Sequence, residues 1–372
     1  MAAGLRFRGE PRVRRQGSPF RGWGVLLAAL VAFSCSSAAR PDCSTGVPLG
    51  SVCGFSNPED VAWSRAHEAL LVSEMAPLGE EGGALAAWTP GAPTPWRVWP
   101  AGSSLAQVRV AGVGEADCPP VSPAAFAPHG IVVGPDDRLY VVNHGGRESV
   151  EIFTLAGAAA EVTATWAGCI LLPEGTSGND IAVAQDGEVL VANYMPALAS
   201  VTGNLKQLFG MPTGDIIAWR AGTGWRHVPN TEASAPNGVE VDREGRMIFF
   251  AETGGQQVVR VRRADGGARA EVEIDGALDN LAWSEDGRLL VASHDSIPSF
   301  LACVGADACR APWSVWEVNP NTLAVERVLQ HDGSVVGAVA SAEEVGDRVY
   351  LSAVFGDRIG VWERRAPAPS RE

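Results

Sequence analysis

The segment NGVEVDREGRMIFFAE (237–252) contains a short apolar strand, a turn with Glu-Gly, and a second apolar strand. A glycine in such a turn supplies the positive φ angle that a tight hairpin needs. The unit occurs six times, at intervals that suit the blades of a propeller. The other copies are EDVAWSRAHEALLV (59–72), HGIVVGPDDRLYVVNH (129–144), NDIAVAQDGEVLVAN (179–193), DNLAWSEDGRLLVASH (279–294) and VGAVASAEEVGDRVYLSAVF (336–355).

Further strands rich in β-branched and aromatic residues follow each copy, but the sixth copy is followed by only one, at 359–364. A closed propeller leaves no strand edge unpaired, so we expect the segment 47–55 to supply the missing strand. The sequence therefore predicts an all-β fold, a six-bladed β-propeller formed by residues 40–366 as a single domain. Residues 367–372 are expected to be a disordered tail.

The composition of the 372-residue chain excludes a disordered or fibrous protein, because 46% of the residues are hydrophobic. The formal net charge is −14. An acidic surface argues against nucleic acid and anionic membranes as partners and suits a protein that binds cations. Oligomeric state does not follow from these features.

The N-terminal segment has the layout of an export signal, which we assign to residues 1–39. Several arginines precede the apolar run GVLLAALVAF (24–33), and small residues follow it. The run is too short to span a bilayer. Cys35 leaves open a bacterial lipoprotein, in which a lipid on Cys35 would be the only membrane contact. The protein is therefore expected to be periplasmic, an outer-membrane lipoprotein, or secreted.

Six further cysteines in an exported chain indicate disulfides, although six cysteines allow 15 connectivities. Cys303 and Cys309 enclose a five-residue segment and are the pair that we predict. The chain has no CxxC motif and no Cys/His cluster, so the sequence does not predict a zinc site.

Polar residues open five of the six repeats, just before the first apolar residue. In a propeller the first strand of each blade lines the central channel, so these side chains should meet at one mouth of it. In four of these five blades the residues are carboxylates and carboxamides, and oxygen ligands of this kind, without His or Cys, suit calcium. Asn and Asp before a strand are also common turn residues that bond their own backbone, but turn chemistry alone explains five blades in phase less well. The residues are Glu59-Asp60, His129-Gly130, Asn179-Asp180, Asn237-Gly238 and Asp279-Asn280.

Seven short segments, in order along the chain, resemble the paraoxonase/arylesterase family. The resemblance implies a calcium-dependent six-bladed propeller that hydrolyses lactones and aryl esters. Each segment is weak alone, but seven in order are specific. They are SNPEDVAW (56–63), PHGI (128–131), VVNH (141–144), VEIF (150–153), NDIAV (179–183), PNGV (236–239) and LDNLAWS (278–284).

The resemblance implies two calcium ions. The catalytic ion would be held by Glu59, Asn179, Asn237, Asp279 and Asn280. The structural ion would be held by Asp60, Asp180 and the backbone carbonyl of Ile131. The family's mammalian members also have a disulfide from the N-terminal strand to the last blade. This chain has no cysteine after Cys309, so closure must rest on strand pairing or on other bridges.

The resemblance also implies that His129 and His144 form a catalytic pair that activates water, and that His294 lies at the mouth of the substrate pocket. Glu59 or Asp279 are alternative bases. No Gly-x-Ser-x-Gly motif is present, which disfavours a serine hydrolase. Two other functions stay open: a gluconolactonase-type sugar lactonase, whose pattern lacks the histidine pair, and a non-catalytic propeller that binds a partner and uses calcium only for stability.

Overall fold

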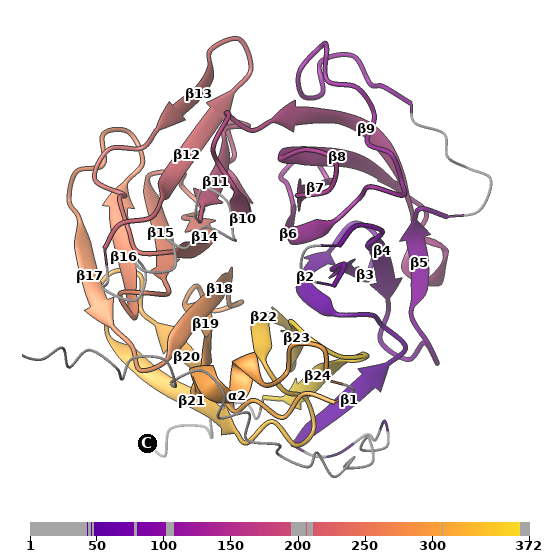
Figure 1. Cartoon of the computed structure of the whole chain (residues 1–372), viewed down its shortest axis with the longest axis vertical. Helices are drawn as coiled ribbons and strands as arrows, with labels where there is room; N and C mark the ends of the chain where they lie inside the picture. Colours follow the sequence, from indigo (N-terminus) through magenta and orange to yellow (C-terminus); the bar gives the residue numbers. More distant parts are fainter. Residues whose placement is uncertain are drawn as a thin grey trace, which may run out of the picture. The chain divides into compact units, whose positions relative to one another are not determined.

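The computed structural model describes residues 43, 46, 48–77, 80–101, 108–194, 206, 211–306 and 308–364. In this part of the chain the strands form six antiparallel sheets of four strands each, arranged as blades around one central axis (Figure 1). The predicted six-bladed β-propeller is therefore confirmed. The predicted signal 1–39, with Cys35, and the predicted tail 367–372 lie outside the described residues.

Each blade has an inner strand next to the axis, a second strand, a third strand and an outer strand (Figure 1). The inner strands are β2 (Pro58–Ser64), β6 (Pro128–Val133), β10 (Gly178–Val183), β14 (Pro236–Val241), β18 (Ala277–Trp283) and β22 (Val339–Val345). The second strands are β3 (Ala69–Glu74), β7 (Arg138–Asn143), β11 (Val189–Asn193), β15 (Met247–Glu252), β19 (Leu289–His294) and β23 (Arg348–Ala353).

The third strands are β4 (Ala84–Trp88), β8 (Ser149–Ala156), β12 (Asp215–Arg220), β16 (Gln257–Arg262), β20 (Trp313–Val318) and β24 (Arg358–Glu363). The outer strands are β5 (Trp96–Trp99), β9 (Thr163–Leu171), β13 (Gly224–His227), β17 (Ala270–Glu273), β21 (Val325–His331) and β1 (Leu49–Cys53). Two short helices complete the described elements, the 3-10 helix η1 (Ala159–Glu161) and the α-helix α2 (Ile297–Leu301).

The ring is closed by the N-terminal strand, as predicted. β1 pairs antiparallel with β24, with Leu49 opposite Trp362 and Cys53 opposite Arg358. The last blade therefore takes three strands from the C-terminal end of the chain and its outer strand from the N-terminal end. A disulfide between Cys43 and Cys53 lies on the closing strand itself. Closure thus rests on backbone pairing, which needs no bridge to the last blade.

The hydrophobic core lies between neighbouring sheets, where buried side chains of adjacent blades interdigitate. Between blades 1 and 2, the rings of Trp99 and Phe126 meet edge to face with centroids 4.5 Å apart. Phe153 contacts both of these rings, and all three side chains are buried. Aromatic packing of this kind holds the two sheets face to face.

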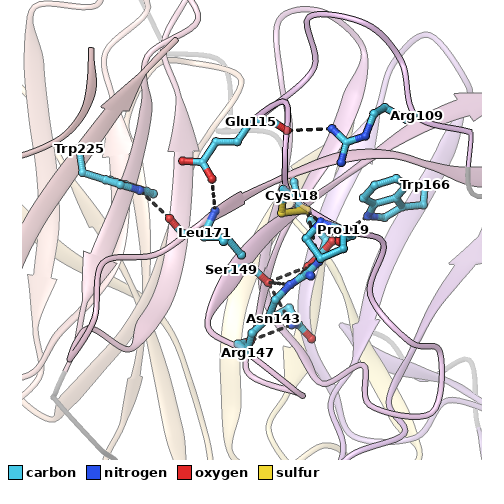
Figure 2. Close-up of a disulfide and its surroundings, with 12 residues drawn as sticks. Arg109, Glu115, Cys118, Pro119, Asn143, Arg147, Ser149, Trp166, Leu171 and Trp225 are labelled. Carbon is cyan, nitrogen blue, oxygen red and sulfur yellow. Dashed lines mark hydrogen bonds and ion pairs between the residues drawn. A yellow bond between two sulfur atoms is a disulfide. The ribbon is translucent and has the colours of Figure 1, made fainter. Parts of the chain in front are cut away.

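Residues 108–118 form a strap along the edge of blade 2 (Figure 2). The backbone N–H groups of Val110 and Glu115 donate to carbonyl oxygens of β9. A disulfide between Cys118 and Cys169 ties the end of the strap to the same strand. The strap therefore covers an edge that would otherwise expose unpaired backbone groups. This disulfide was not predicted from the sequence, whereas the predicted Cys303–Cys309 bond is present.

Removing the two non-terminal disulfides should destabilise the protein unequally. Chain entropy predicts a loss of about 4 kcal/mol for Cys118–Cys169 and about 2 kcal/mol for Cys303–Cys309, because the first closes a much longer loop. We expect the variant with Cys118→Ser and Cys169→Ser to unfold at lower urea concentration than the variant with Cys303→Ser and Cys309→Ser. Equal midpoints would contradict a role for the strap in stability.

Candidate functional site

The polar residues that open the repeats lie in β-bulges of the inner strands. In β10 the register with β11 shifts between Gly178 and Ile181, so Asn179 and Asp180 lie outside the regular ladder. Corresponding shifts occur at the start of the inner strands of the other five blades. A bulge redirects side chains and interrupts pairing. The bulges therefore allow these side chains to reach neighbouring blades as well as their own sheet.

Two glycines show how closely the inner strands approach one another at this level. A Cβ atom on Gly130 would lie 2.6 Å from the backbone oxygen of Asn179 in the next blade. A Cβ atom on Gly238 would lie 2.6 Å from the backbone nitrogen of Leu281, again in the next blade. Contacts this short exclude any side chain. Glycine is thus required in blades 2 and 4 so that the neighbouring strands can carry the polar pairs.

All five residues predicted for the catalytic calcium are buried: Glu59, Asn179, Asn237, Asp279 and Asn280. Four of them each have a buried side-chain oxygen without a hydrogen-bond partner, namely Glu59 Oε2, Asn179 Oδ1, Asn237 Oδ1 and Asn280 Oδ1. The Nδ2 group of Asn280 donates to Glu59 Oε1 over 3.3 Å, which brings blades 5 and 1 together. Because buried acceptors are nearly always satisfied, four orphaned oxygens point to a missing partner.

The residues predicted for the structural calcium connect neighbouring blades. Asp60 Oδ2 accepts a hydrogen bond from the backbone N–H of Ile131 in blade 2, and Asp180 Oδ2 accepts one from Val239 in blade 4. Both aspartates are buried. Burial and the charge of Glu59 raise the pKa of Asp60 to about 7, and burial and Asp60 raise the pKa of Asp180.

The two predicted histidines contact each other directly. His129 Nδ1 lies 2.9 Å from His144 Nε2, and His129 Nε2 lies 3.3 Å from Glu59 Oε1. Burial alone would lower the pKa of His129, but the carboxylates of Glu59 and Asp279 outweigh burial and raise it to about 9. On its other side, His144 Nδ1 contacts the carboxylate of Glu148. Glu148 was not among the predicted residues.

The third predicted histidine also joins the site. His294 Nε2 lies 2.8 Å from Asp279 Oδ2, and both side chains are buried. The ring of His294 packs against Phe300 of helix α2, with centroids 4.4 Å apart. Phe300 packs in turn against Phe355 of the last blade. His294 thus lies between the cluster of predicted calcium ligands and an apolar surface formed by Phe300 and Phe355.

The donor set fits a hard cation better than a transition metal. Among the described residues, no group of three or more His, Cys, Asp and Glu side chains is arranged to hold a metal ion. The centre instead combines the carboxylates of Glu59 and Asp279 with the amide oxygens of three asparagines. Carboxylate and amide oxygens are the ligands of calcium, and two carboxylates balance the charge of one such ion. The residues present therefore fit calcium.

A cavity of about 1310 Å³ lies at the opposite ends of the inner strands and is lined by none of these residues. Its wall contains Arg220, Arg226 and Arg263, which form ion pairs with Glu188. These charges connect blades 3 and 4 and are largely neutralised within the protein. We therefore place the candidate site at the bulges, where buried polar atoms lack partners, and not in this cavity.

The fold resembles solved structures at low sequence identity. A luciferin-regenerating enzyme matches with a TM-score of 0.53 and 12% identity, over 85% of this chain and 98% of that chain. A gluconolactonase from Xanthomonas campestris matches with a TM-score of 0.53 and 14% identity, over 85% and 88% of the two chains. The PQQ-bound aldose sugar dehydrogenase from Streptomyces coelicolor matches with a TM-score of 0.51 and 14% identity, over 85% and 97%.

No protein-family model and no curated protein sequence matches the chain. The similar structures confirm the propeller fold. Their names describe different reactions, and one fold hosts many functions. The reaction must therefore be argued from the side chains of the site.

Two acidic residues of the inner strands, Glu240 of β14 and Glu343 of β22, should make stability depend on pH. Burial and the charge of Glu343 raise the pKa of Glu240 to about 8, and burial, with Asp60, raises that of Glu343 to about 8. A carboxyl group with a higher pKa in the folded state contributes stability below its unfolded pKa, and this contribution is lost as the pH rises. For chelator-treated protein we expect the free energy of unfolding to fall between about pH 5 and pH 8.

The control for this prediction is the double variant with Glu240→Gln and Glu343→Gln. The amide oxygen of Gln can still accept the backbone hydrogen bonds that each Glu receives from Val241 and Trp63. Urea unfolding at several pH values should therefore give a flatter profile for the double variant. A profile as steep as that of the parent would contradict the assignment of the pH dependence to these two groups.

Proposed function

We propose that the protein is an exported, calcium-dependent hydrolase of the paraoxonase/arylesterase type, which opens lactones or hydrolyses aryl esters. The observation that carries the proposal is the set of four orphaned oxygens on Glu59, Asn179, Asn237 and Asn280, next to the imidazole of His129. A cation site and a base side by side are the parts needed for attack of water on a carbonyl group.

Glu59, Asn179, Asn237, Asp279 and Asn280 would hold the catalytic calcium. When bound, this ion would supply the positive charge that stabilises an oxyanion developing on the substrate carbonyl. Asp60, Asp180 and the carbonyl of Ile131 would hold the second ion. The two aspartates already join neighbouring blades through hydrogen bonds to backbone N–H groups, so this second ion would mainly stabilise the ring.

His129 is the proposed base. Its Nε2 atom faces Glu59, while its Nδ1 atom is engaged by His144. The negative charge of Glu59 favours the protonated imidazole. Once that charge is balanced by a cation, the neutral form is favoured, and a neutral imidazole can accept a proton from water. His144 then disperses the charge that forms on His129. Glu59 and Asp279 are alternative bases.

The neighbouring residues would position the substrate. Asp279 accepts a hydrogen bond from His294, which fixes the imidazole at the edge of the centre. Phe300 and Phe355 extend an apolar surface from His294. An ester or lactone would thus place its carbonyl at the oxygen-rich centre and its apolar part against these rings. This arrangement is why we propose a small-molecule substrate.

A gluconolactonase-type sugar lactonase is the second candidate, because gluconolactonases are among the solved structures with this fold. The contact between His129 and His144 favours the first candidate, since the sugar-lactonase pattern lacks the pair.

Export agrees with three disulfides, which form in oxidising compartments. Among the described residues, no helix is long and apolar enough to cross a membrane. A periplasmic, lipid-anchored or secreted location is part of the proposal.

A substrate panel tests the proposed activity. Aliphatic lactones, phenyl acetate and gluconolactone should be assayed with purified protein before and after treatment with a chelator. We expect hydrolysis of aliphatic lactones or phenyl acetate, its loss on chelation, and its recovery when calcium is added but not when magnesium is added. Activity that resists complete chelation would contradict the proposal, and turnover of gluconolactone alone would favour the second candidate.

Replacing the proposed base tests the mechanism. His129→Gln keeps a polar side chain but removes the proton acceptor, so kcat should fall by roughly 10²–10⁴. Calcium content and melting temperature should barely change, because His129 is not a proposed ligand. The control is His227→Gln, which alters an exposed imidazole on an outer strand. A kcat within a few-fold of the parent would mean that Glu59 or Asp279 is the base.

A further inference from the structure

Glu148 has no role in the proposed function, yet it contacts the histidine pair. Its oxygens Oε1 and Oε2 lie 2.9 and 3.0 Å from His144 Nδ1. The glutamate follows the turn between β7 and β8, and 31% of its side chain is exposed. Glu148 and Glu59 lie at opposite ends of the histidine pair. The four side chains contact one another in the order Glu148, His144, His129, Glu59.

The turn that carries Glu148 is rigidly built. Asn143, at the end of β7, is fully buried, and its Nδ2 group donates to the backbone oxygens of Gly145 and Arg147. Asn143 Oδ1 accepts the N–H of Ala127 from the preceding loop. A Cβ atom on Gly145 would lie 1.4 Å from the backbone oxygen of Ala125, so glycine is required there. The backbone conformation of this turn thus fixes the positions from which the side chains of His144 and Glu148 extend.

Arg147, which precedes Glu148 in the chain, is paired with a different carboxylate. The guanidinium of Arg147 forms its ion pair with Glu151, over 2.7 Å, and also contacts Ser149 (Figure 2). Glu151 is fully buried and also accepts a hydrogen bond from Trp166. Arg147 is therefore directed into blade 2 and does not compete with His144 for the carboxylate of Glu148.

The carboxylate of Glu148 is also held by the next blade. The hydroxyl of Ser177 lies 3.4 Å from Oε1, and the N–H of Gly178 donates to Oε2 over 3.3 Å. Gly178 directly precedes Asn179, one of the proposed ligands. Glu148 thus connects the histidine pair to the strand that carries part of the cation site.

We propose that Glu148 is a positioning residue that sets the tautomers of both histidines, an inference that rests on the proposed function. A carboxylate only accepts hydrogen bonds, so His144 must carry its proton on Nδ1. The Nε2 atom of neutral His144 then accepts, and His129 must donate from its own Nδ1. The lone pair of neutral His129 is left on Nε2, the atom that faces Glu59 and the proposed cation.

Without Glu148, the opposite arrangement becomes available. His144 could carry its proton on Nε2 and donate it to His129 Nδ1, which would place the proton of His129 on the side of the substrate. In that tautomer His129 has no lone pair for water. A side chain that fixes one tautomer of a catalytic histidine can affect the rate strongly without touching the substrate.

Glu148→Gln tests the proposal, because the Gln side chain has the same shape but can either donate to or accept from His144. We expect kcat to fall roughly 10- to 100-fold, part of the effect of losing a general base, with KM within about two-fold. Glu148→Asp, which keeps a carboxylate, should restore part of the lost kcat. The matched control is Glu174→Gln, which removes one exposed charge from the loop between β9 and β10.

Nitrogen-15 NMR of histidine-labelled protein reads the tautomers independently of activity. The calcium-loaded parent should show neutral His144 with its proton on Nδ1, and Glu148→Gln should show a mixture or the Nε2 form. A parent without hydrolase activity would count against the proposed function and leave this readout intact. An unchanged His144 tautomer in the Gln variant would overturn the inference, as would an active parent whose kcat is unaffected by the substitution.

Discussion

The inner strands pack so closely around one axis that only some of their bulge positions can carry a side chain. Gly130 and Gly238 have no room for a Cβ atom because the neighbouring strands approach to within contact distance. The polar side chains at the remaining bulge positions therefore share a small, buried volume. Their carboxylates repel one another, and burial makes the charged form of each unfavourable. The raised pKa of Asp60 is one consequence. A cation would relieve this repulsion and satisfy the orphaned oxygens together.

The same constraint places the proposed base, His129, beside the proposed cation site. His129 precedes Gly130, so its imidazole is presented at the level of Glu59 and is held from behind by His144. Because the residues of the proposed site come from blades 1 to 5, the site exists only when the ring is closed. Pairing of β1 with β24 is therefore a condition for the chemistry as well as for stability.

Much of the fold could be predicted because its signals are local. Each repeat contains its own two strands and turn, and the unpaired strand at 359–364 required a partner near the N-terminus, which β1 supplies. The short loop between Cys303 and Cys309 likewise made that pair predictable. The polar residues could be recognised because they occupy the same position in five of the six repeats. Their assignment to two ions came from the family resemblance and stays a proposal.

Non-local contacts could not be predicted in this way. Cys118 and Cys169 are 51 residues apart, with most of blade 2 between them in the sequence, and this spacing carries no signal. Glu148 lies in a turn whose path depends on Asn143 and the preceding loop, so no local pattern relates it to His144. The calcium content of the folded chain tests the central claim most directly. After dialysis against buffered calcium, elemental analysis should find two ions per chain, falling to one or fewer in Asp60→Ala; a parent chain that binds none would contradict the account.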